Sequence, residues 1–169
     1  AIMEYYRYTR DVGFLREMWP YVVKAVGYIE FLRQQRLTEQ YRTDPAIIAY
    51  MGLVPESISH EGYASHPRHS YWDNFVILRG LKDAAAIAVV LGEDEEATRF
   101  AALRDAFRRD LYNSIRETLK MHGIDFIPGA VELGDFDATS TTVAVDPGGE
   151  LGRLPQPALD RTFERYFDH

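Results

Sequence analysis

The chain has 169 residues, of which 46% are hydrophobic and 27% are charged, with a formal net charge of −7. This balance suits one globular domain or part of one, and it excludes a disordered tail. The acidic surplus opposes binding to nucleic acid or to a membrane surface. No cysteine is present, which excludes disulfides, cysteine nucleophiles and thiolate metal sites. The longest apolar stretch, 75–91, is interrupted by Arg79, Lys82 and Asp83, so we expect no membrane span.

The first part of the chain predicts helices. Residues 2–9 are typical of the end of a helix and no signal peptide precedes them, so we expect an internal segment of a longer protein. Asp11 is a predicted N-cap for a helical piece over 14–18, and a second piece restarts at Pro20, which a first helical turn tolerates. Apolar residues then recur at helical spacing, at Val22, Val23, Val26 and Ile29.

The helical pattern breaks between residues 37 and 70. A short helix is expected over 45–51, and the rest of this stretch has no period. Such a long irregular stretch inside a compact domain is usually either functional or disordered. Because it carries Tyr63 and three histidines and leads into Tyr71 and Trp72, we interpret it as functional.

Two long helices follow. The segment 72–91 is apolar over more than half its circumference, which predicts burial between other elements, and Gly92 ends it. Acidic residues at 93–96 open the next helix, which carries one apolar stripe from Phe100 to Leu119 and ends at Gly123. A buried helix followed by an amphipathic one indicates a helical hairpin in a layered array.

The last part of the chain predicts loops and short helices, not a sheet. Asp137 is the expected N-cap of a helix over 138–145, and a final helix starts near Pro157 and runs to the end of the chain. The expected fold class is therefore all-α.

Four phrases of the sequence carry a resemblance to a known superfamily. In chain order they are YYRYTRDVGFL at 5–15, GLVPE at 52–56, SYWDN at 70–74 and DFDATS at 135–140. They resemble phrases of the six-hairpin glycosidases, which include glucoamylase, trehalase and the glycogen-debranching glucosidases. The resemblance covers most of the chain and implies part of an (α/α)6 toroid, in which inner and outer helices alternate.

The resemblance also implies partners. A complete toroid needs twelve helices and this sequence predicts about six, so we expect an incomplete catalytic domain. Half a toroid would leave apolar surface exposed on the helix at 72–91, and such patches associate. The expected partners are the rest of the parent domain or a second copy of the chain, besides an oligosaccharide or glycoside substrate.

Asp73 has two open interpretations. Cleavage of a glycosidic bond commonly uses two carboxyl groups, one protonating the leaving oxygen while the other activates water or attacks the sugar. The resemblance implies that Asp73, at an inner helix head beside Trp72, is the general acid, although debranching-type members have one more residue between the Trp and the Asp. Alternatively, Ser70 and Asp73 match a capping box, which needs no chemistry.

Further residues complete the expected site. Glu56 is the second catalytic candidate, with plain loop solvation as its alternative. The expected sugar contacts are Trp72, Tyr71, His69, Glu61 and Asp135. The histidines around Glu61 lack the i, i+4 geometry of the helical zinc motif, so we expect no metal site.

The leading hypothesis is therefore a glycoside hydrolase that uses carboxylate acid/base chemistry and, by the resemblance, inverts the anomeric centre. No phosphate-binding loop or dinucleotide fingerprint is present, so we expect no cofactor. A non-catalytic α-helical scaffold or interaction module stays open, although no internal repeat of fixed period supports a solenoid. A related toroid epimerase or lyase is the other alternative.

Overall fold

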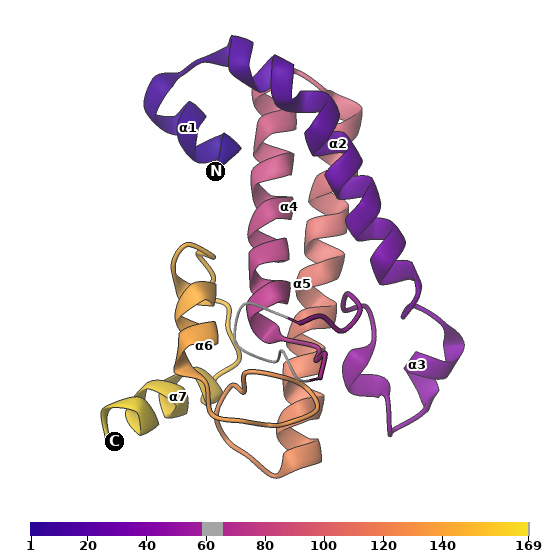
Figure 1. Ribbon diagram of the computed structural model, residues 1–169, viewed down its shortest axis with the longest axis vertical. Coiled ribbons are helices and arrows are strands. Elements are labelled where there is room, and N and C mark those ends of the chain that lie inside the picture. Colours follow the sequence, from indigo (N-terminus) through magenta and orange to yellow (C-terminus); the bar gives the residue numbers. More distant parts are fainter. Residues whose placement is uncertain (59–65, 169) are drawn as a thin grey trace.

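The computed structural model describes residues 1–58 and 66–168 and is built of helices (Figure 1). In these ranges the extended residues form isolated bridges instead of strands, which confirms the all-α prediction. A 3-10 helix, η1 (Ile48–Tyr50), accompanies seven α-helices: α1 (Ile2–Thr9), α2 (Val12–Gln34), α3 (Glu39–Thr43), α4 (Tyr71–Leu91), α5 (Asp94–His122), α6 (Ala138–Val145) and α7 (Ala158–Phe167).

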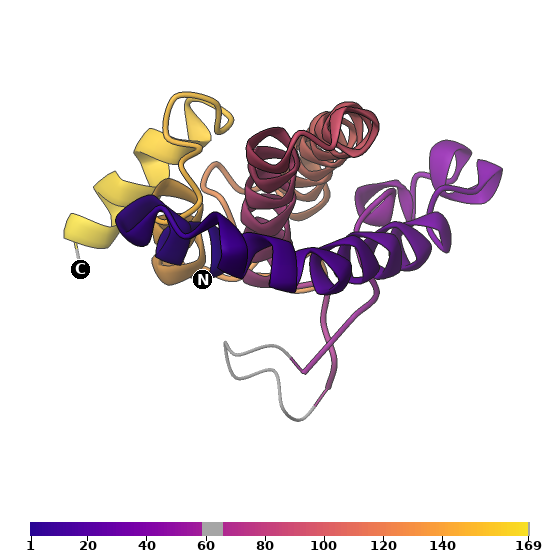
Figure 2. The same cartoon turned by 90° about the horizontal axis from the view of Figure 1, so that it is seen from above.

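The α4 and α5 helices form the predicted hairpin, and the two run side by side along the molecule (Figures 1 and 2). The chain reverses at Gly92, whose φ of 75° is a left-handed conformation that glycine adopts without strain. Fully buried side chains from both helices fill the space between them, at about 1.5–3 kcal/mol for each large apolar group. They include Phe75, Leu78, Leu81, Phe107, Leu111 and Ile115.

One continuous helix, α2, packs across α4, so the predicted break before Pro20 is wrong. A proline inside a helix removes one backbone donor, here the partner of the Arg16 carbonyl. Pro20 and Arg16 are both exposed, which lets water satisfy that carbonyl. The opposite face of α2 stays anchored because Leu15, Val22 and Val26 are buried.

The remaining helices are short. α6 packs on α4 and α7 on α6, and Asp137 caps α6 as predicted, accepting the amide of Thr139 at 2.9 Å. Within the expected helix at 45–51 only the 3-10 turn η1 forms, and α3 precedes it without having been predicted.

Part of the apolar surface is left uncovered. Val76 and Val89 are 48% and 69% exposed, so the prediction that the helix at 72–91 is buried between other elements is wrong at these two positions of α4. The reason is that the neighbours of α4, namely α1, α2, α5 and α6, leave these two side chains uncovered in the described chain. In residues 1–58 and 66–168, no helix combines the length and the hydropathy needed to cross a bilayer.

Candidate functional site

The candidate site starts from the segment 52–57, which α2 and α5 hold in place. Gly52 has a φ of 72°, and a side chain there would collide with Asp110 of α5. Arg33 is 3% exposed, and its Nε donates to the carbonyl of Gly52 at 2.9 Å while its Nη2 pairs with Asp110 at 2.5 Å. The start of the segment is therefore locked to two helices.

Asn74 ties the same segment to the first turn of α4. Its Oδ1 accepts the amide of Val54 at 3.4 Å, and its Nδ2 donates to the carbonyl of Ser70 at 2.7 Å. Ser57 therefore lies over the head of α4, where its hydroxyl donates to Asp73 Oδ2 at 2.6 Å.

The structure contradicts the part of the capping-box interpretation that concerns Ser70. Ser70 is the N-cap residue of α4, but among the described residues its side chain makes no capping hydrogen bond. Asp73 instead shares a hydrogen bond with the loop residue Ser57. Its carboxylate thus joins the head of α4 to the segment 52–57.

Glu56, the other predicted catalytic carboxylate, is held by an arginine and lies next to His69. Arg36 Nη2 donates to Glu56 Oε2 at 2.5 Å, and His69 Nε2 lies 3.5 Å from the same oxygen. A hydrogen bond from its own backbone amide lowers the pKa of Glu56 most, burial opposes it, and His69 and Arg36 lower it further. The net shift is downward, so Glu56 is ionised at neutral pH, while its side chain stays 49% exposed.

His69 lies beside Glu56 and is oriented by its own hydrogen bonds. Because Arg36 Nε–H donates to His69 Nε2 at 3.0 Å, the ring proton resides on Nδ1, which donates to Glu132 Oε1 at 2.7 Å. Glu132 also accepts the backbone amide of His69 at 3.0 Å, and the ring of Tyr50 packs 4.6 Å away. His69 is 8% exposed, so it positions its neighbours instead of offering a sugar-contacting surface.

Glu132 places a negative charge on the side of His69 opposite Arg36. Burial raises the pKa of Glu132, but hydrogen bonds from the His69 side chain and from backbone amides outweigh burial and lower it overall. A carboxylate on one side of His69 and a guanidinium on the other therefore fix the orientation of the imidazole ring.

A cleft of about 450 Å³ opens beside these carboxylates. It brings together three of the predicted site residues, Glu56, Trp72 and Asp73, with an apolar wall from α2 and α4. Its lining comprises Tyr28, Leu32, Val54, Pro55, Glu56, Ser57, Trp72, Asp73, Val76 and Ile77. Trp72 also lines a second cavity of about 320 Å³ on its other side, against α6 and α7. A cleft with an aromatic wall and two carboxylates has the composition of a site for a neutral polar ligand.

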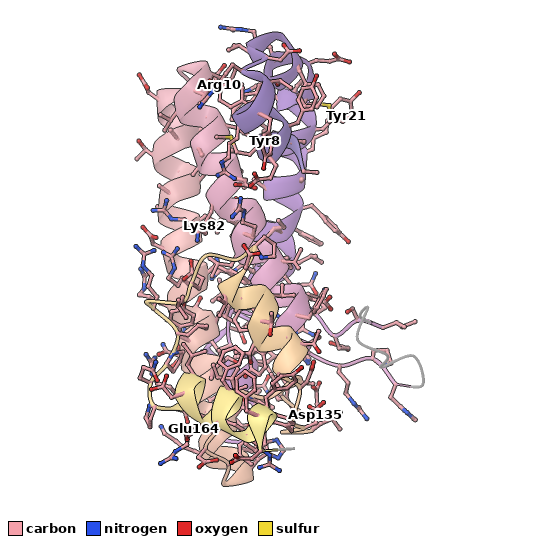
Figure 3. All side chains as sticks on the ribbon, turned by 90° about the vertical axis from the view of Figure 1, so that its left-hand side faces the viewer. Tyr8, Arg10, Tyr21, Lys82, Asp135 and Glu164 are labelled. Atoms are coloured by element: carbon pink, nitrogen blue, oxygen red, sulfur yellow. The ribbon has the colours of Figure 1, made fainter. Side chains whose placement is uncertain are left out.

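The other predicted contacts do not line this cleft. Tyr71 is fully buried, and its hydroxyl bonds to Ser114 at 2.9 Å and Thr118 at 2.8 Å, so it packs α4 on α5 and is not a surface contact. Asp135 accepts the amide of Ala130 at 3.0 Å within its own loop (Figure 3). Glu61 lies outside the described residues.

Three residues of the site were missed in the sequence. Arg36, Ser57 and Glu132 come from the end of α2, the irregular stretch and a distant loop, and no shared motif links them. The GLVPE and SYWDN phrases indicated this part of the chain, but neither phrase indicated these three partners.

The described residues hold no cluster of three or more potential metal ligands. Comparisons with protein-family models, with curated proteins and with solved structures gave no match to this chain. The cleft is therefore interpreted from its own geometry and from the sequence resemblance.

Proposed function

We propose that the chain is part of a glycoside hydrolase that binds its sugar in the cleft at the head of α4. The observation that carries this proposal is the meeting of Glu56, Asp73 and Trp72 around one open cleft of about 450 Å³. Two carboxyl groups and an aromatic face form the minimum set for binding a pyranose and cleaving its glycosidic bond.

The proposed roles follow from the environment of each carboxyl group. Glu56 is kept ionised by Arg36 and its backbone, which suits a base that takes a proton from water or an acceptor for sugar hydroxyls. Asp73 remains as the group that protonates the leaving oxygen, and the Ser57 hydroxyl orients it. Water attacking the anomeric carbon opposite the leaving group would then invert the configuration.

We extend the proposal to a partial (α/α)6 toroid, with α4 and α6 as inner helices and α5 as an outer one. The uncovered apolar side chains support a missing neighbour, because they gather on α2 and on the adjoining face of α4. Tyr21, Tyr28, Phe31 and Val76 are all about half exposed or more. The neighbour is the rest of the parent domain or a second copy of the chain.

The test is binding of gluco-, manno-, galacto- and rhamno-oligosaccharides, followed by calorimetry. We expect saturable binding of one series, with Trp72→Ala weakening it at least about tenfold through loss of stacking worth roughly 1–2 kcal/mol. Tyr8→Ala is the matched control, because Tyr8 is an 88% exposed aromatic residue on α1 that does not line the cleft (Figure 3).

Hydrolysis of the bound sugar adds the catalytic test. Asp73→Asn should retain sugar binding and lose turnover if Asp73 is the acid. Absence of binding across the panel, or equal loss in Trp72→Ala and Tyr8→Ala, would overturn the proposal and favour a helical interaction module.

A further inference from the structure

Another cavity, of about 430 Å³, lies midway along the α4–α5 hairpin and is strongly basic. Six of its eight lining residues carry a positive charge, in a chain whose formal net charge is −7. The lining comprises Arg7, Arg79, Lys82, Asp83, Arg104, Asp105, Arg108 and Arg153. Four segments contribute to it: α1, α4, α5 and the chain after α6.

The positive charge of this basic pocket is only partly neutralised within the described chain. Two carboxylates line the pocket, Asp83 and Asp105, and two more pair with its cations from outside, Glu4 and Glu150. Six cations against these four carboxylates leave an excess of two positive charges. A surplus of this size inside a concave surface attracts anions.

Contacts to the buried Glu150 hold the wall of the basic pocket in place. Glu150 is 1% exposed and accepts Lys82 Nζ at 2.8 Å, Arg108 Nε at 2.8 Å and the Tyr112 hydroxyl at 2.5 Å. Lys82 also donates to two carbonyls of the loop before Glu150. These contacts fix the basic side chains in advance, which lowers the entropic cost of binding a ligand.

Arg153 stands at the mouth of the pocket with its donors available. It is exposed, and although its backbone amide donates to the carbonyl of Glu150 at 2.8 Å, its guanidinium makes no hydrogen bond or ion pair among the described residues. Arg104 uses Nε and Nη2 on its neighbour Asp105, and its Nη1 makes no hydrogen bond in the same set. Guanidinium groups with spare N–H donors bind oxyanions in a forked geometry.

We propose that the basic pocket binds a doubly charged oxyanion, namely a phosphate group, either as free phosphate or as a phosphate monoester. A dianion matches the surplus of two charges, and the guanidinium donors match tetrahedral phosphate oxygens. The site is separate from the proposed sugar cleft, because no residue lines both cavities. The inference therefore does not depend on the proposed hydrolase activity.

The experiment titrates the 169-residue chain with inorganic phosphate, methyl phosphate and acetate by calorimetry at low ionic strength. We expect saturable binding of at least one phosphate ligand, weaker binding of the monoanion acetate, and a loss of affinity on addition of salt. The relative affinities of phosphate and methyl phosphate then decide between a free anion and an ester.

Arg153→Ala should weaken phosphate binding about tenfold or more, the effect of losing one charge-assisted hydrogen bond. Arg16→Ala is the matched control, because Arg16 is an exposed arginine that does not line the pocket, and it removes the same charge. Unfolding of both variants by circular dichroism checks that the helices persist. Absence of saturable phosphate binding, or equal weakening by Arg16→Ala in folded protein, would overturn the proposal.

Discussion

Glu150 and Glu56 are both paired with an arginine, yet their surroundings are opposite. Glu150 is 1% exposed and joins α4 and α5 through Lys82 and Arg108, whereas the side chain of Glu56 is 49% exposed beside a cleft. The same pairing chemistry therefore serves the fold in one place and leaves a carboxylate available for a ligand in the other. Exposure, not the identity of the partners, separates the two.

The largest effect we expect is on stability, from Glu150→Gln. The variant leaves Lys82 and Arg108 half-paired in a nearly dry site, which typically costs about 3–5 kcal/mol when one partner of a buried pair is removed. Urea denaturation followed by circular dichroism measures the change in the free energy of unfolding.

Asp105→Asn is the control for Glu150→Gln, because it removes a charge that also contacts Arg108. The side chain of Asp105 is 46% exposed, so we expect a loss below about 1 kcal/mol. Similar losses for the two variants would mean that burial does not distinguish these carboxylates.

The same comparison predicts a pH dependence. Burial raises the pKa of Glu150, but hydrogen bonds from Arg108, Lys82 and Tyr112 outweigh burial and lower it overall. A lowered pKa contributes stability that is present above the unfolded value, near 4.5, and is lost as the pH falls through the folded value. The stability gap between wild type and Glu150→Gln should stay constant from about pH 6 to 8 and shrink below about pH 4.5. A gap that persists at pH 3 would contradict this assignment.

The sequence predicted the α4–α5 hairpin well, but it did not predict the ion network at the head of α4. Helical periodicity identified the α4–α5 hairpin and Gly92 at its turn, because burial imposes a regular spacing on apolar residues. Arg36 and Glu132 belong to no periodic pattern, and they meet His69 only after distant loops are folded against one another. The head of α4 could be predicted from Trp72 and Asp73, whereas the ion network beneath it could not.

Tyr71→Phe tests the boundary between the hairpin core and the cleft. The variant removes a hydroxyl bonded to Ser114 and Thr118, and we expect a loss of about 1–2 kcal/mol in the free energy of unfolding. Sugar binding should not change, because Tyr71 is fully buried. A large loss of sugar affinity in a folded variant would return Tyr71 to the site.

Glu56→Gln should give the smallest change in stability and thereby the sharpest contrast with Glu150. Because Glu56 is half exposed, water can take over the donors of Arg36, and we expect a loss below about 1 kcal/mol by the same urea titration. Turnover should nevertheless fall about 100-fold or more if Glu56 is the base, since positioned acid–base groups contribute factors of about 10²–10⁴.

Arg36→Gln provides the companion variant, because it leaves Glu56 in place but removes the group that pairs with it. The acidic limb of the pH–rate profile should then move to higher pH, as the pKa of Glu56 rises toward its ordinary value. Should Glu56→Gln instead unfold the protein as strongly as Glu150→Gln does, Glu56 would be a second structural carboxylate and would no longer be a candidate for the base.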